Sequence, residues 1–168
     1  MSVIDFDIRL FCRFYHEPKG WEVLLTSLLN RGWRTIGNKI EKEKFEIQLI
    51  AESEDKYEVF ISLKSRDKYI DPRELRELLE PIISNCWYAD VYYCFRNIDF
   101  ERIGKQFNLD LKINELKRIK INGVEVVLES YPSLKKIIFS YRVSIRELEA
   151  VKKIHPKLLG QILMEKVM

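Results

Sequence analysis

The order of hydrophobic periodicities along the first 97 residues limits the folds available to this chain. Apolar side chains alternate with a period of two, or recur at helical spacing, in six successive segments at 6–15, 19–31, 45–51, 57–63, 71–85 and 87–96. A period of two indicates a half-buried strand and a spacing of three or four indicates an amphipathic helix, so the order is strand, helix, strand, strand, helix, strand. Two such halves, joined by right-handed crossovers, give a four-stranded antiparallel sheet with both helices on one face.

This predicted α+β arrangement is a ferredoxin-like βαββαβ core, and we assign it to residues 1–97. Residues 98–168 are predicted to form a C-terminal extension docked on the core. The extension contains a short helix near 99–107, a hairpin at 119–126 that turns at Asn122-Gly123, and a strand at 137–143. A helical C-terminus follows from Ser144, and Pro156 is expected to start a second helix because the residue before a proline avoids helical geometry.

The best-defined helix start is the segment Asp71-Pro72-Arg73-Glu74. Asp71 fits the N-cap, Pro72 fits the first helical position, and Glu74 is placed to reach back to the backbone amide of the cap. Pro81 is expected to break or kink this helix near its end, because it removes a backbone donor. Residues 33–42 are ambiguous, since they fit the beginning of the following strand with a bend at Gly37-Asn38.

Length and composition indicate an ordinary globular protein. With 168 residues, 46% of them hydrophobic and 33% charged, the chain is long enough to bury a core without disulfides or metal. No run approaches the roughly 18 consecutive apolar residues of a membrane span, and the first residues lack a signal pattern, so we expect a cytoplasmic protein without a membrane partner. The abundance of Ile, Lys and Glu is typical of a thermophile, although an AT-rich genome produces the same bias.

The cysteines and the known sequence motifs give no sign of a metal or cofactor. Cys12, Cys86 and Cys94 include no Cys-x-x-Cys pair, and we expect free, buried thiols. His16 and His155 do not complete a zinc site at finger-like spacing. Phosphate-binding loops, dinucleotide-binding turns, nucleophile elbows and zinc-protease helices are all absent from the sequence, so we expect no cofactor.

Basic residues are concentrated in the C-terminal part of the chain. Residues 1–96 carry a net charge of −2 and residues 97–168 a net charge of +5. Cationic side chains on one surface favour binding to phosphates. The candidate nucleic-acid-binding residues are Arg9, Arg13, Lys117, Arg118, Lys120, Lys135, Lys136, Lys152, Lys153 and Lys157. The competing interpretation is that these side chains only solvate the surface.

A second candidate is the far face of the predicted sheet, which carries the aromatic residues Phe11, Phe60, Tyr88 and Tyr92 among Arg9, Arg13, Lys64 and Arg96. This layout resembles the RNA recognition motif, although that family's Gly-Phe/Tyr-Gly-Phe run is absent from the third strand. The resemblance implies that the rings stack on unpaired bases while guanidinium groups hold the backbone. The interpretation that we prefer is that the extension covers this face and makes Phe11, Phe60 and Tyr92 part of the core.

Two weaker patterns concern the C-terminus and His16. Residues 144–167 fit a helix-turn-helix with its turn at Ile154-His155-Pro156. The position of His16, just after the first strand, is similar to that of the histidine in CRISPR repeat-processing ribonucleases, which also use ferredoxin-like domains. That resemblance implies general acid or base chemistry in metal-independent RNA cleavage. It covers one residue, and we expect no catalytic activity that depends on His16.

The leading functional hypothesis is therefore a non-enzymatic module that binds RNA, DNA or a nucleoprotein through its basic C-terminal half. The alternative is a protein-interaction or self-assembly subunit whose aromatic sheet face packs against another chain. A metal-independent ribonuclease that uses His16 is the third possibility.

Overall fold

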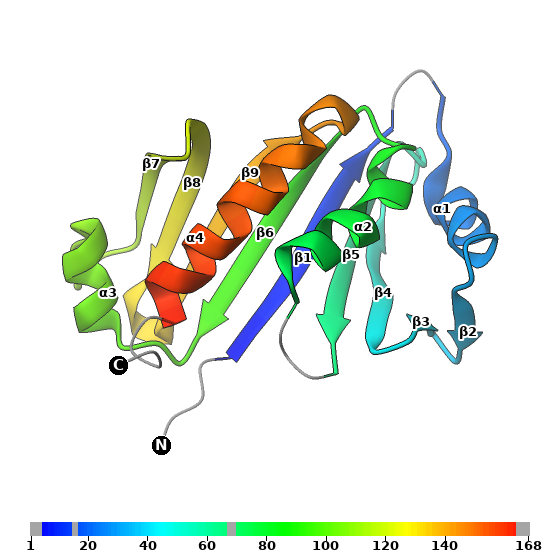
Figure 1. The fold of residues 1–168 in the computed structure, drawn as a ribbon. Helices are drawn as coiled ribbons and strands as arrows, with labels where there is room; N and C mark the ends of the chain where they lie inside the picture. Colours follow the sequence, from blue (N-terminus) through cyan, green and yellow to red (C-terminus); the bar gives the residue numbers. More distant parts are fainter. Residues whose placement is uncertain (1–4, 15–16, 67–69, 164–168) are drawn as a thin grey trace.

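The structure is a computed structural model that describes residues 5–14, 17–66 and 70–163, and it has a mixed α+β fold (Figure 1). The strands are β1 (Asp5–Arg13), β2 (Arg34–Ile36), β3 (Lys39–Lys42), β4 (Phe45–Glu52), β5 (Glu58–Ser65), β6 (Tyr88–Arg96), β7 (Glu115–Ile121), β8 (Val124–Tyr131) and β9 (Lys136–Val143). They form one nine-stranded sheet in the order β2-β3-β4-β5-β1-β6-β9-β8-β7. Every neighbouring pair is antiparallel.

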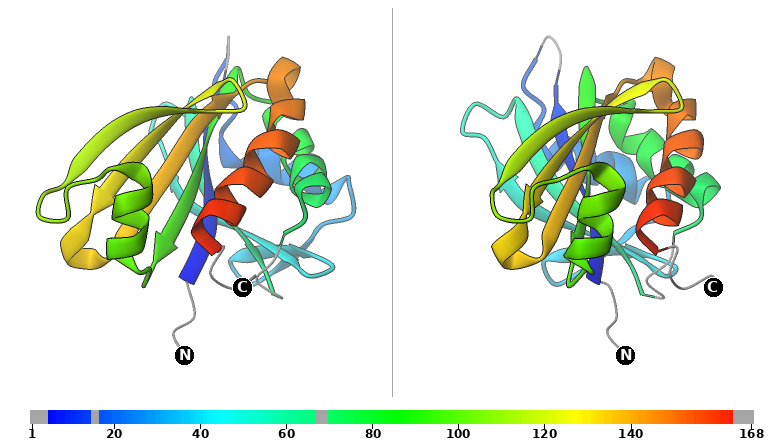
Figure 2. Two further views of the ribbon diagram at one scale, coloured as in Figure 1. Left: turned by 60° about the vertical axis from the view of Figure 1, so that its left-hand side comes forward. Right: turned by 90° about the vertical axis from the view of Figure 1, so that its left-hand side faces the viewer.

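The helices of the described residues all lie on one face of this sheet (Figure 2). They are α1 (Gly20–Leu29), α2 (Pro72–Ile83), α3 (Phe100–Phe107) and α4 (Val151–Leu163), with the short 3-10 helices η1 (Pro132–Leu134) and η2 (Ile145–Ala150). Helices α2 and α4 pack side by side over the middle strands. None of the helices in this part of the chain is long and apolar enough to span a membrane.

Side-chain alternation along the strands explains why the helices share a face. In β1, Ile8, Leu10 and Cys12 are fully buried, whereas Arg9 and Phe11 between them are partly exposed. The neighbouring strands β5 and β6 carry matching buried side chains opposite those of β1. One face of the sheet is therefore apolar across its width, and burying it against the amphipathic helices removes that apolar surface from water.

The sheet is larger than the predicted four strands. Residues 33–42, which the sequence leaves ambiguous, form the β2–β3 hairpin with Gly37 at φ +62°, and this hairpin extends the sheet beyond β4. On the other side, β9 pairs with β6 and continues the sheet into β8 and β7. The extension therefore joins the core through backbone pairing at a strand edge. The division of the chain at residue 97 stays a prediction.

Local signals in the sequence are confirmed where they involve only neighbouring residues. The Asp71 carboxylate accepts a hydrogen bond from the Arg73 amide at 2.8 Å, and the Asp71 amide donates to Glu74 at 3.1 Å. Pro81 lies in the last turn of α2, which continues to its end at Ile83. Asn122 and Gly123 both have positive φ, as a tight two-residue hairpin requires.

The predicted helix-turn-helix is wrong. Helix α4 runs through Pro156 without a turn and is preceded only by the 3-10 helix η2. Ile154 and His155 before the proline, and Leu158 and Leu159 after it, are all buried. Because this apolar stripe continues on both sides of Pro156, and the proline itself is exposed, packing against α2 favours a single helix over the local break.

The expectation of three free thiols is also wrong, because Cys12 and Cys86 form a disulfide with a Cα–Cα distance of 5.9 Å. Cys12 lies on the helix side of β1, and Cys86 follows the C-terminus of α2. The pair is 74 residues apart in the sequence, so only the folded crossover brings it together. A loop of that length corresponds to about 4 kcal/mol of stabilisation in the loop-entropy account. Cys94 is a free buried thiol, and burial raises its pKa.

A buried hydrogen-bond chain links α4 to the sheet. His155 Nε2 lies 2.7 Å from the carbonyl oxygen of Ile70, and Nδ1 lies 2.9 Å from the Tyr93 hydroxyl. Since a carbonyl oxygen only accepts, Nε2 carries the proton and Nδ1 accepts from Tyr93. The Tyr141 hydroxyl, 3.1 Å away, then donates to the Tyr93 oxygen. Burial lowers the pKa of His155, which favours the neutral imidazole that this arrangement needs.

The hydrogen-bond chain predicts unequal effects for two similar substitutions. Tyr93→Phe leaves both His155 Nδ1 and the Tyr141 hydroxyl without a partner, at about 1–3 kcal/mol for each buried group. Tyr141→Phe removes only a donor, and Tyr93 keeps its bond to His155, so the loss is about 1 kcal/mol. Urea unfolding of the two variants measures the difference. Equal losses, or a larger loss for Tyr141→Phe, would show that the chain of donors is assigned incorrectly.

The buried hydrogen bonds of His155 also predict that the folded protein loses stability at acid pH. The folded pKa of His155 lies below its ordinary value of 6.5, so the unfolded protein binds more protons as pH falls below about 6.5. The free energy of unfolding should therefore decrease from that pH down to the folded pKa. His155→Gln, whose amide offers a donor and an acceptor, should remove most of this decrease, and His16→Gln should not. Urea midpoints between about pH 8 and 5 test this, and an unchanged pH profile in His155→Gln would contradict it.

Candidate functional site

The face of the sheet opposite the helices is not covered by any helix of the described chain (Figure 2). We call the outward side chains of the four middle strands the open face. They are Asp7, Arg9, Phe11 and Arg13 of β1; Glu58, Phe60, Ser62 and Lys64 of β5; Tyr88, Asp90, Tyr92, Cys94 and Arg96 of β6; and Lys136, Ile138, Ser140 and Arg142 of β9. The preferred expectation that the extension covers this face is wrong, because α4 packs on the opposite side.

The four aromatic residues predicted for this surface do share the open face, and all four are partly exposed. Phe11 lies opposite Phe60 in the β1–β5 register, and Tyr92 lies opposite Arg9 in the β1–β6 register. The rings of Phe60 and Tyr92 meet edge to face, with centroids 6.0 Å apart. These rings form a half-exposed aromatic strip across the middle of the sheet.

One end of the open face gathers cations around a single carboxylate. Asp7 accepts hydrogen bonds from Arg96 Nη1 at 2.5 Å and from Arg9 Nε at 2.9 Å. Burial alone raises the pKa of Asp7, but these two hydrogen bonds outweigh it and the pKa lies below the ordinary value. Lys64 of β5 and Lys136 of β9 flank this group at the same end of the strands. Asp7 thus holds two guanidinium groups in place at this end of the sheet.

The other end of the open face carries an aromatic and guanidinium cluster. The Arg142 guanidinium lies 3.9 Å from the centroid of the Tyr88 ring and binds Asp90 through Nε at 2.9 Å and Nη2 at 3.3 Å. The Trp87 ring lies 5.4 Å from that of Tyr88 and is 54% exposed. Arg13 pairs with Glu58 at 3.1 Å on the neighbouring strands.

Sequence reasoning missed Trp87 and Arg142 as site residues. No local signal marks Trp87, because tryptophan is highly buried on average and alternation groups it with the buried Ala89 and Val91. Arg142 has no local signal either, because its contact with Tyr88 depends on the pairing of β6 with β9. That pairing joins segments about 50 residues apart, which local patterns do not reveal.

The charges of the open face are unbalanced. Its described side chains include six cations, Arg9, Arg13, Lys64, Arg96, Lys136 and Arg142, against the three carboxylates Asp7, Glu58 and Asp90. Each of the three carboxylates binds at least one arginine. The middle of the sheet therefore presents positive charge beside partly exposed aromatic rings.

The ten predicted nucleic-acid-binding residues do not form one surface. Arg9, Arg13 and Lys136 belong to the open face, and Arg118 and Lys120 lie on the same side at the edge strand β7. Lys117 points to the helix side and donates to the backbone oxygen of Asn108, and Lys135 lies in the turn before β9. Lys152, Lys153 and Lys157 are exposed on α4, across the sheet from the aromatic residues.

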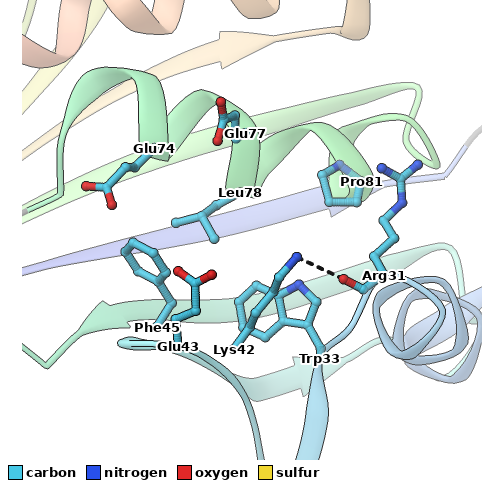
Figure 3. A pocket seen from close by; sticks show the side chains of 9 residues that line it. All are labelled: Arg31, Trp33, Lys42, Glu43, Phe45, Glu74, Glu77, Leu78 and Pro81. Carbon is cyan, nitrogen blue, oxygen red and sulfur yellow. Dashed lines mark hydrogen bonds between the residues drawn. The ribbon is translucent and has the colours of Figure 1, made fainter.

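A small pocket of about 260 Å³ lies on the helix side, between α2 and the β3–β4 turn (Figure 3). Trp33 and Phe45 form its apolar floor, and Lys42 crosses it to donate to the Arg31 carbonyl at 2.8 Å. Three glutamates and two cations line the rim, a mixed set without a nucleophile or a catalytic pair. Within residues 5–14, 17–66 and 70–163, no group of three side chains is placed to hold a metal ion.

His16 lies outside the described residues, so its predicted lack of a catalytic role stays a prediction. The predictions of a cytoplasmic location and a thermophilic source also remain untested.

Comparison of the chain with protein-family models, curated proteins and solved structures finds no match. No relative therefore suggests an activity, a ligand or a partner. The functional argument rests on the geometry and charge of the open face.

Proposed function

We propose that the protein binds single-stranded nucleic acid on the open face of its sheet. The observation that carries this proposal is the half-exposed aromatic strip of Phe11, Phe60, Tyr88 and Tyr92, set among an excess of cations on a face that no helix of the described residues covers. Exposed rings give unpaired bases a surface on which to stack, and nearby cations attract the phosphates. Duplex bases are stacked on one another and offer no such faces.

On this proposal, different parts of the open face bind the bases and the phosphates. In the middle of the face, bases can contact the ring faces or edges of Tyr92 and Phe60. At one end, they can contact those of Trp87 and the neighbouring Tyr88. The cations near Asp7 at the other end suit phosphates. Asp7 fixes the positions of Arg9 and Arg96. A guanidinium group has five N–H donors, and Arg9 binds Asp7 through Nε, so it keeps other donors for a phosphate.

We also propose that the middle of the fold is a ferredoxin-like unit. The strand order β4-β5-β1-β6, with α1 and α2 on one face, supports this assignment. On this view, β2 and β3 are added at one edge and β9, β8 and β7 at the other. The proposed binding face then belongs to the central unit together with β9.

Fluorescence anisotropy tests the function with labelled oligo(U) and oligo(dT) of about 12 nucleotides and with a duplex. We expect both single strands to bind more tightly than the duplex, and affinity to fall between about 50 and 200 mM salt because phosphate contacts release counterions. Tyr92→Leu should weaken binding by about 1–3 kcal/mol through lost stacking.

A matched pair of double variants separates the open face from the helix side. Lys64→Gln with Lys136→Gln removes two charges from the open face without breaking an ion pair of the described chain. Lys153→Gln with Lys157→Gln removes two charges from α4. The first pair should weaken binding and reduce the salt slope by about two, and the second should change little. Equal effects, or binding that ignores salt, would overturn the proposal and favour a protein partner.

A further inference from the structure

The edge strand β7 has the features of a peptide-docking site. No described strand pairs with its outer edge. Three large apolar side chains on β7 and in the segment before it are exposed: Leu111 at 42%, Ile113 at 53% and Leu116 at 62%. An edge strand of seven residues offers a row of unpaired backbone groups to another chain.

The tight hairpin determines which residues of β7 face outward. Asn122 and Gly123 form the two-residue turn, so the flanking residues Ile121 and Val124 exchange both backbone hydrogen bonds. By alternation, Ile119 and Lys117 also direct their backbone groups toward β8. Leu116, Arg118 and Lys120 direct theirs outward.

The side chains of the three residues whose backbone groups point outward favour a partner of a particular charge. Leu116, Arg118 and Lys120 all lie on the same side of the sheet and are all exposed. Two of the three are cationic. Glu125 pairs with Arg118 at 2.7 Å and leaves Lys120 without an ion pair in the described chain. A strand with carboxylates on that side would place them opposite these cations.

We propose that β7 takes an extended acidic segment of a partner protein as a tenth strand of the sheet. Backbone hydrogen bonds to Leu116, Arg118 and Lys120 supply the affinity, and alternating side chains supply the specificity. Acidic side chains of the added strand lie beside Arg118 and Lys120. Apolar side chains between them point to the other side, toward Ile119 and Ile121.

A second copy of this chain fits the edge less well. An antiparallel pair of β7 strands centred on Arg118 sets the two Arg118 side chains directly opposite each other. Like charges in that position destabilise strand pairing. The same cations that favour an acidic peptide therefore oppose self-association.

A fluorescein-labelled peptide of four Val-Glu repeats is the probe, measured by anisotropy against the full chain. Arg118→Pro removes an outward backbone donor while leaving the β7–β8 hydrogen bonds in place. We expect it to weaken peptide binding by about tenfold or more. Thr35→Pro is the matched control, because Thr35 is the corresponding outward position of the opposite edge strand β2. It should leave the affinity unchanged.

Two further measurements complete the test. One uses the variant Arg118→Lys, and the other uses a block peptide, which has the same composition as the probe but carries its valines and its glutamates in two separate runs. Arg118→Lys keeps the charge and the backbone donor and should bind within about twofold of the parent, whereas the block peptide, which lacks alternation, should bind weakly. Equal binding of the two peptides, or an unaffected Arg118→Pro, would overturn the proposal. A dimer of the free chain that Arg118→Pro dissociates would also overturn it. Nucleic-acid binding on the open face is measured separately and is independent of these outcomes.

Discussion

The arrangement of this protein depends on the alternation of buried and outward side chains along β1, β5, β6 and β9. Since every second residue of these strands is apolar and buried, one face of the sheet has to be covered, and α1, α2, α3 and α4 all lie on it. The intervening residues are mostly polar, charged or aromatic, with Ile138 as an aliphatic exception, and they face away from the helices. A continuous sheet follows directly, with the helices of the described residues on one side and an opposite face that these helices leave uncovered.

Local interactions explain which parts of this fold the sequence predicts. The capping box at Asp71 and the turn at Asn122-Gly123 involve residues two or three positions apart, and their patterns are visible in the chain. The four longer strands and the two helices of residues 6–97 are also recognised, because each needs only its own periodicity, whereas the short hairpin strands β2 and β3 are not. The number of strands in the sheet could not be predicted in this way. No local pattern indicates that β9 pairs with the edge of β6, because the two strands are far apart in the sequence.

Long-range packing accounts for the errors. The Cys12–Cys86 disulfide spans 74 residues and depends on the crossover that brings α2 back beside β1. Pro156 signals a helix break, but the buried stripe on both sides of it, with His155 anchored to Tyr93, outweighs that signal. The aromatic residues of the open face were placed correctly by alternation. Their exposure was not, because it depends on where α4 packs.

The central claim is that the open face, and not the basic helix α4, receives single-stranded nucleic acid. Amide chemical shifts of the labelled protein, followed during titration with oligo(U), test this most directly. We expect the largest shifts at Phe60, Tyr88 and Tyr92 and at the strands around Asp7, with little change along α4. Shifts concentrated on α4, or no shifts at saturating oligo(U) in low salt, would contradict the account.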